Sequence, residues 1–112
     1  MRENLVGIGR ALVDGGLVVG AGGNLTARVA ADRLLATPTG WNLGDIGPDD
    51  LAEVGADGRH LAGAHAATSE LPLHLAVLAA RPDVGWALHA HPPMATLLDA
   101  LVTARSTFAT PS

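Results

Sequence analysis

The stretch that decides most about this chain is Val84-Gly85-Trp86-Ala87-Leu88-His89-Ala90-His91. It is typical of a β-strand, and side chains alternate across a strand, so His89 and His91 leave the same face. Only small residues share that face, and we expect Val84, Trp86 and Leu88 on the core side. Two converging histidines supply half of a catalytic zinc site, which typically has three protein ligands and one open position. The competing interpretation is a strand end whose imidazoles contact solvent or neighbouring polar groups.

Length and composition predict one folded domain. The chain has 112 residues and 48% hydrophobic residues, enough for a modest core. We therefore expect a single domain over residues 1–112, with residues 106–112 as a flexible tail. The formal net charge of −4 offers no basic surface for nucleic acid or an anionic membrane. With no signal-peptide pattern and no apolar run long enough to span a bilayer, we expect a cytoplasmic location.

Three missing residue types restrict the chemistry. All seven basic residues are arginines, so no lysine amine exists to form a Schiff base. The chain also lacks cysteine, which excludes disulfides, thiolate ligands and cysteine nucleophiles, and it lacks tyrosine as a proton donor. An enzyme built from this chain must use His, Asp, Glu, Ser, Thr, Arg, backbone groups and a metal.

Helices and strands interleave along the predicted pattern, which favours an α/β or α+β class. Periodicity and turn signals predict these elements: a helix over Glu3–Asp14 with Leu5, Ile8 and Leu12 on one stripe, strands at Leu25–Val29 and Arg33–Ala36, a turn at Pro48–Asp50, strands at Leu51–Val54 and Arg59–Leu61, a helix over Ser69–Arg81, and a last helix from Pro92. Each of the two strand pairs is spaced as a hairpin.

Thr68-Ser69-Glu70 precedes the histidine strand and opens the predicted second helix. Ordinary N-capping accounts for such a triplet. The functional interpretation is an anion site, because hydroxyls and backbone N–H groups at a helix start suit a phosphate. Gly22-Gly23-Asn24 and Thr37-Pro38-Thr39-Gly40 offer further donors, and glycine allows close approach to a ligand. We expect His74 to pair with Glu70 at i,i+4 spacing rather than to bind metal.

Taken together, these motifs resemble the class II aldolase/adducin family over about Leu5 to Leu98. The matching blocks, in order, are Gly22-Gly23-Asn24-Leu25-Thr26, Thr37-Pro38-Thr39-Gly40, Thr68-Ser69-Glu70-Leu71-Pro72-Leu73-His74, Arg81-Pro82-Asp83-Val84 and His89-Ala90-His91-Pro92. The resemblance implies a three-layer α/β/α fold with a mixed, mostly antiparallel central sheet. It also implies a homotetramer, with sites between subunits.

The resemblance further implies a role for each matching residue. Glu70 would be the catalytic acid/base, and His89 and His91 would be two of three zinc ligands. The residues that would bind the substrate phosphate are Asn24, Thr39, Gly40, Thr68 and Ser69. The implied reaction is zinc-dependent aldol cleavage of a small phosphorylated sugar, such as fuculose or rhamnulose phosphate, with the metal stabilising an enediolate. A metal-dependent aldolase needs no lysine, in agreement with the composition.

The chain departs from the family pattern at its C-terminal end. No histidine follows His91 to supply the third zinc ligand, and family members are commonly about twice as long. The resemblance thus implies the N-terminal part of the domain, truncated at the C-terminus or naturally short. A sugar-phosphate 4-epimerase, a dehydratase and a non-catalytic relative like the adducin head stay open as alternatives. A cupin-like barrel is disfavoured because no glutamate follows Glu70.

The remaining aromatic and imidazole side chains receive structural interpretations. We expect His60 and His65 to be exposed, on a hairpin arm and in a loop. Trp41 and Trp86 are expected to pack in the core or at a subunit contact. Any of the other histidines is a reserve candidate for the third metal ligand, although nothing in their spacing requires it.

Overall fold

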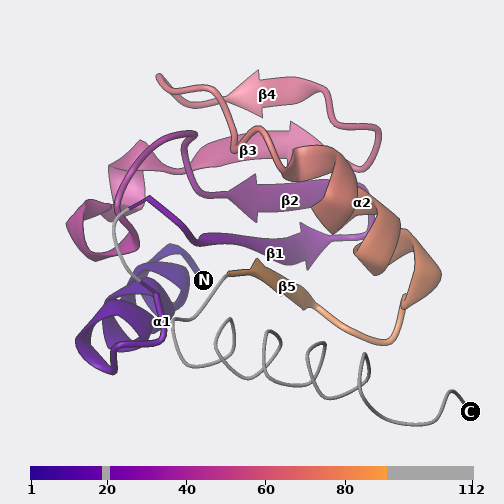
Figure 1. Ribbon diagram of the computed structural model, residues 1–112. Helices are drawn as coiled ribbons and strands as arrows, with labels where there is room; N and C mark the ends of the chain where they lie inside the picture. Colours follow the sequence, from indigo (N-terminus) through magenta and orange to yellow (C-terminus); the bar gives the residue numbers. More distant parts are fainter. Residues whose placement is uncertain (19–20, 91–112) are drawn as a thin grey trace, which may run out of the picture.

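The computed structural model describes residues 1–18 and 21–90 of the chain (Figure 1). The elements are α1 (Arg2–Asp14), β1 (Asn24–Ala30), β2 (Arg33–Ala36), the 3-10 turns η1 (Leu43–Asp45) and η2 (Pro48–Asp50), β3 (Ala52–Gly55), β4 (His60–Ala62), α2 (Leu71–Ala80) and β5 (Trp86–His89). The predicted helices, both hairpins and the histidine strand are thus confirmed, with shifts of one or two residues at their ends. The expected helix from Pro92, the tail 106–112 and His91 lie outside the described residues.

The five strands form one sheet in the order β4-β3-β2-β1-β5. β1 and β2 form the first hairpin, with Thr26 opposite Ala36, and β3 and β4 form the second. β5 returns to pair with β1, with Leu25 opposite Leu88, so the histidine strand lies beside the first strand (Figure 1). Every ladder within residues 21–90 is antiparallel, so the expected mixed character is not seen there.

One helix covers each face of the sheet. Successive residues of β2 separate into two hydrophobic clusters, because side chains alternate across a strand. Leu35 packs with Leu5 and Val6 of α1, whereas Leu34 packs with Leu71 and Leu78 of α2. These two apolar layers hold the sheet between the helices and thereby position the loops at the strand ends.

The buried stripe of α1 is rotated from the predicted one. Leu5, Val6 and Gly9 are buried, while Ile8 is 40% exposed. The stripe is centred near Gly9, where α1 crosses η1, and at 100° per residue Ile8 falls at its edge. The expectation that Ile8 belongs to the core was therefore wrong.

The two faces of β5 agree with the expectation only in part. Ala87 is 8% exposed and packs in the cluster beneath α2, whereas Leu88 is 51% exposed. Trp86 packs against the α1-side cluster, and Val84, which precedes the strand, packs against the α2-side cluster. Ala87 is small, and it lies on the face of β5 that α2 covers, where the helix approaches the strand closely. His89 shares that face with Ala87 by alternation.

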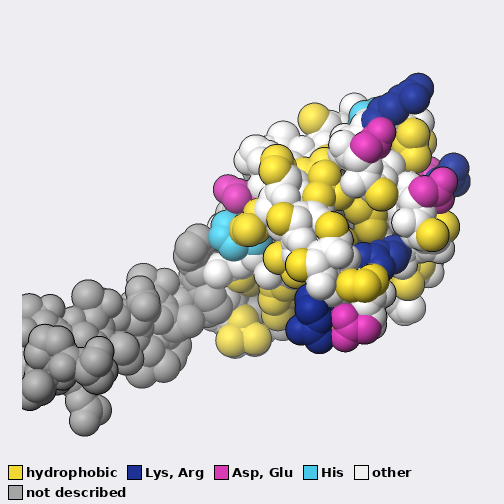
Figure 2. Space-filling model, turned by 90° about the vertical axis from the view of Figure 1, so that its right-hand side faces the viewer, with side chains coloured by type: hydrophobic (Ala, Val, Ile, Leu, Met, Phe, Trp, Pro, Cys, Tyr) yellow, Lys and Arg dark blue, Asp and Glu magenta, His cyan; other side chains and the backbone are white. Residues whose placement is uncertain are grey.

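On the described surface, the basic side chains are spread out and do not form one patch. On the face in Figure 2, the Arg side chains are separate and lie beside acidic or apolar ones. The ion pairs of the described residues include Arg33 with Glu53, at 3.2 Å, and Arg81 with Asp83, at 2.9 Å. Among residues 1–18 and 21–90, neither helix has the length and apolar character that crossing a membrane requires.

Candidate active site

A cavity of about 330 Å³ opens where the loops before β1, after β2 and before α2 meet the end of β5. Its lining includes Asn24, Thr39, Gly40, Thr68, Ser69, Glu70 and His89. Seven of the eight residues singled out from the sequence therefore line one cavity. His91, the eighth, lies outside the described residues.

The loop after β2 is held by backbone and hydroxyl hydrogen bonds. The Thr37 amide donates to the Leu25 carbonyl at 3.0 Å, and the Leu25 amide donates to Thr37 Oγ1 at 3.1 Å. On its other side, the Thr68 amide donates to the Thr37 carbonyl at 2.8 Å, and the Thr39 amide donates to the Ala66 carbonyl at 3.1 Å. Thr37 thus connects β1 to the loop before α2 and fixes Thr39 and Thr68 beside each other.

Gly40 and Gly23 both line the cavity, and each position requires glycine for a different structural reason. Gly40 has φ of +75°, a left-handed conformation that is unfavourable for other residues. A Cβ on Gly23 would lie 2.7 Å from Val18 Cγ1 and 3.0 Å from Leu43 Cδ1. Gly23 is therefore required by packing against the core below the cavity, rather than by the close approach to a ligand that its sequence context suggested.

The start of α2 is a turn closed by Thr68. Its Oγ1 accepts a hydrogen bond from the Glu70 amide at 3.2 Å, and the Leu71 amide donates to the Thr68 carbonyl at 3.0 Å. The helix itself begins at Leu71, two residues later than predicted. The Thr68 hydroxyl thus closes a turn ahead of the helix and does not cap it. The N-cap residue is Glu70, without a side-chain cap bond, so the expected N-capping was wrong. Ser69 is exposed on the lining of the cavity.

Glu70 and His89 lie beside each other on the cavity wall, with Glu70 Oε2 3.8 Å from His89 Nδ1. The Glu70 side chain is 46% exposed and the His89 side chain 26% exposed. This arrangement leaves the carboxylate accessible to a ligand while the imidazole is held by the sheet.

The donors on this side of the cavity are of the kinds that zinc binds, namely an imidazole nitrogen and a carboxylate oxygen. Within residues 1–18 and 21–90, no cluster of three or more His, Cys, Asp or Glu side chains is arranged to hold a metal ion. The described part thus brings together one imidazole, His89, and one carboxylate, Glu70, and His91 is the next imidazole in sequence.

His74 does not form the expected pair with Glu70. Its side chain is 1% exposed, with Nδ1 3.0 Å from Thr26 Oγ1 and Nε2 hydrogen-bonded to Asn24 Oδ1. The i,i+4 prediction failed because the face of α2 that carries His74 is turned toward β1 rather than to solvent. Burial lowers the pKa of His74, and nearby His89 lowers it further.

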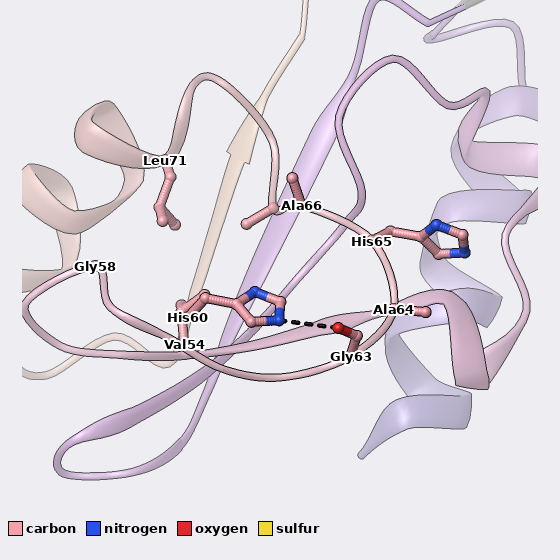
Figure 3. A pocket seen from close by; sticks show the side chains of 9 residues that line it. Val54, Gly58, His60, Gly63, Ala64, His65, Ala66 and Leu71 are labelled. Atoms are coloured by element: carbon pink, nitrogen blue, oxygen red, sulfur yellow. Dashed lines mark hydrogen bonds between the residues drawn. The ribbon is translucent and has the colours of Figure 1, made fainter.

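His60 and His65 line a different cavity, of about 440 Å³, between β4 and the loop that follows it (Figure 3). His60 is exposed as expected, and its Nε2 lies 2.9 Å from the Gly63 carbonyl oxygen. His65 points away from it in Figure 3 and is only half-exposed, because it packs on Trp41 and pairs with Asp50 at 3.4 Å. Neither ring lies beside His89, so the described structure supports neither as a third metal ligand.

Trp41 is the lining residue whose position the sequence did not predict. It packs partly buried against the α1-side cluster, as expected of a core residue, and it also lines the cavity that holds Glu70 and His89. Its ring centroid is 4.7 Å from that of His65. An aromatic residue directly after the left-handed Gly40 is the signal that could have indicated this.

Comparison with known proteins assigns the family. The sequence model described as "Class II Aldolase and Adducin N-terminal domain" matches residues 3–110. The chain therefore belongs to the class II aldolase/adducin family, and the resemblance inferred from its motifs is confirmed.

The relatives include enzymes named for several reactions. The chain is 38% identical to the 5-methylthioribulose-1-phosphate/5-deoxyribulose-1-phosphate aldolase of Rhodospirillum rubrum, over 90% of this chain and 45% of the relative. It is 36% identical to the L-fuculose phosphate aldolase of Methanocaldococcus jannaschii, over 89% and 54% respectively. Other relatives are named methylthioribulose-1-phosphate dehydratase, from Pseudomonas syringae, and 3-oxo-tetronate 4-phosphate decarboxylase, from Escherichia coli.

Solved structures support the same fold. A structure described as L-fuculose 1-phosphate aldolase matches with a TM-score of 0.81 and 30% identity, covering 89% of this chain and 48% of the other. The α/β architecture with its largely antiparallel sheet is thus that of class II aldolases. The chain spans about half the length of the relatives it matches.

Proposed function

We propose that this chain carries the phosphate-binding and acid/base side of a metal-dependent aldolase site that cleaves a small phosphorylated sugar of the fuculose- or rhamnulose-phosphate type. The observation that carries the proposal is the single cavity lined by Asn24, Thr39, Ser69, Glu70 and His89. Its volume of about 330 Å³ is the size of a small-ligand site. The aldolases among the relatives are named for phosphorylated sugars, which supports this substrate class.

The phosphate is proposed to bind where the three loops converge. Asn24, Thr39, Gly40, Thr68 and Ser69 surround that end of the cavity and carry amide, hydroxyl and backbone donors. The start of α2 adds a partial positive charge beside them. A phosphate held there leaves the sugar carbons toward Glu70 and His89.

Glu70 is proposed as the general acid/base. Its carboxylate would exchange a proton with the substrate carbon from which the C–C bond is broken, and its partial exposure leaves room for that carbon. His89 and His91 would hold the metal, for which we propose zinc. When bound, the metal supplies Lewis-acid stabilisation of the oxygen that gains negative charge during cleavage.

The test is aldol cleavage by the purified chain with a panel of phosphorylated ketoses, followed by release of the carbonyl products. Glu70→Gln keeps the size of the side chain and removes its proton exchange, so we expect at least a hundredfold loss of rate, the usual size of a general-base effect. Inorganic phosphate should still bind to this variant, and zinc should remain in it. Cleavage by Glu70→Gln at the wild-type rate would contradict the proposed role.

The same assay separates the alternatives. Relatives named as a dehydratase and a decarboxylase favour testing loss of water and of carbon dioxide beside cleavage and 4-epimerisation. Binding of phosphate without turnover of any substrate would instead favour a non-catalytic role, like that of the adducin head.

The complete architecture is also part of the proposal. We propose a three-layer α/β/α domain over residues 1–112 with a tail at 106–112, which assembles into a homotetramer in the cytoplasm. Sedimentation analysis of the purified chain tests the assembly, and a single monomeric species would contradict it.

A further inference from the structure

His74 is a buried imidazole for which the proposed reaction has no use. It projects from α2 toward β1, and its side chain is 1% exposed. Both ring nitrogens have partners on β1: Nδ1 lies 3.0 Å from Thr26 Oγ1, and Nε2 is hydrogen-bonded to Asn24 Oδ1. Thr26 is fully buried and lies outside the cavity lining, whereas Asn24 lines the cavity. The chain of hydrogen bonds therefore runs from the core to the cavity wall.

The chemistry of the partners determines where the protons lie. A carbonyl oxygen only accepts, so the bond to Asn24 Oδ1 requires the hydrogen on Nε2 of His74. In a neutral imidazole the other nitrogen then accepts, and the Thr26 hydroxyl donates to Nδ1. Desolvation, which disfavours the charged form of a buried imidazole, keeps the ring in this neutral form.

The consequence concerns the amide of Asn24. With Oδ1 engaged by His74, the polar atom left for a ligand is Nδ2, which carries two hydrogens. The flipped amide would turn Nδ2 toward the imidazole and leave Oδ1, an acceptor, on the cavity side. An anion is attracted by the first arrangement and repelled by the second, so the hydrogen bond from His74 Nε2 to Asn24 Oδ1 favours anion binding.

We propose that His74 is a positioning residue, which together with Thr26 holds the Asn24 amide with its N–H donors available to an anionic group in the cavity. This inference rests on the proposed function, since it assigns a cause to the phosphate preference of one side of that site. Thr26 holds the imidazole at Nδ1, Nε2 of the ring holds Oδ1 of Asn24, and Nδ2 of Asn24 meets the ligand.

The first test reads the tautomer directly. In the full chain without ligand, the imidazole 15N chemical shifts of His74 should be those of the neutral Nε2–H form. The Nδ1–H form would overturn the inference, whatever the affinity for phosphate. This measurement does not depend on the proposed reaction.

The second test measures inorganic phosphate binding by calorimetry, with the side-chain NH₂ signal of Asn24 followed by NMR. Thr26→Val retains the shape of the side chain but removes the hydroxyl that holds Nδ1 of the imidazole, and His74→Leu removes both bonds. Each should weaken phosphate binding about tenfold or more, the effect of one misdirected hydrogen bond to a charged group. His74→Gln, whose amide can donate to Asn24 Oδ1, should restore affinity to within about threefold of wild type.

The outcomes separate the two proposals. Wild-type affinity in a folded Thr26→Val chain whose circular dichroism is unchanged would overturn the positioning role. The Nε2–H tautomer in a wild-type chain that binds no phosphate would overturn the phosphate site of the proposed function, while the orientation of Asn24 by His74 would stand. Loss in His74→Leu with equal loss in His74→Gln would also contradict the inference, because a merely space-filling role predicts no rescue by Gln.

Discussion

Gly23 shows how tightly the floor of the cavity is packed. A Cβ there would lie 2.7 Å from Val18 Cγ1, a side chain that is itself 2% exposed. We therefore expect Gly23→Ala to lower the free energy of unfolding by about 1–3 kcal/mol, as overpacking of a core does. Urea denaturation measures it.

The matched control is Gly7→Ala on the exposed face of α1, where a Cβ would meet nothing within 4 Å. That change should raise the free energy of unfolding by about 0.5–1 kcal/mol, because alanine is the better helix former. Equal effects of the two substitutions would show that Val18 yields and that the floor is not close-packed.

The burial of His74 predicts a pH dependence of stability. Its pKa in the folded chain lies below the ordinary value of 6.5 because of burial. His89 lowers this pKa further, while a hydrogen bond with the Ala87 backbone and the charge of Glu70 oppose the shift. The unfolded chain therefore binds the proton more readily, so stability is retained above about pH 6.5 and falls as the pH drops below it toward the folded pKa.

The measurement is the free energy of unfolding between about pH 7.5 and pH 5 for wild type and His74→Gln, which lacks the titrating ring. The decline with acid should be shallower in the variant. Parallel curves would mean that the His74 imidazole contributes nothing to acid sensitivity.

At the level of elements, local patterns predicted most of the chain. Alternation and turn residues indicated both hairpins and the histidine strand, and the 3.6-residue period indicated α1 and α2. What the patterns did not determine was which face each element buries. Leu88 and Ile8 are apolar yet 51% and 40% exposed, because the partner that covers a face is set by tertiary packing.

Arg28 makes a second polar contact from β1 to α2, at the opposite end of the helix from His74. Its Nη2 donates to the Leu78 carbonyl at 2.6 Å and its Nη1 to the Pro82 carbonyl at 3.1 Å, at the end where the helix carbonyls lack partners. Arg28→Ala should lower the free energy of unfolding by about 1–3 kcal/mol, the usual size for hydrogen bonds to a charged group.

The control is Arg10→Ala on exposed α1, with an expected change of less than about 0.5 kcal/mol. Hydrogen exchange at the last turn of α2 should accelerate in Arg28→Ala and not in the control. Unchanged exchange would indicate that the helix end is held by packing alone.

For the molecule as a whole, the candidate site was predictable in its residues but not in its supports. Motifs far apart in sequence, such as Thr39 and Glu70, do line one cavity. The roles of Thr37, which links β1 to the loop before α2, and of His74 had no signal in the sequence. Such links depend on distances between elements, which no local pattern contains.

Metal binding by the whole chain predicts a gain in stability. If zinc binds the folded chain at His89 and His91, then zinc at about a hundred times its Kd raises the free energy of unfolding by about 2.7 kcal/mol. Thermal unfolding with and without zinc, together with metal analysis, checks this, and His89→Ala should lose the gain. His60→Ala, in the other cavity, is the control. The same response in His89→Ala as in wild type would exclude His89 as a ligand.

The pairing of β5 with β1 has a consequence for the order of folding. The two hairpins join neighbours in sequence, whereas the β1–β5 ladder joins Leu25 to Leu88 and closes by far the longest of these loops. Loop closure of that length is slow, so we expect β5 to dock after both hairpins have formed. His89 reaches Glu70 only in that late step. A chain that stops short of it has four strands of the sheet and an incomplete cavity wall, because the contact between His89 and Glu70 has not formed.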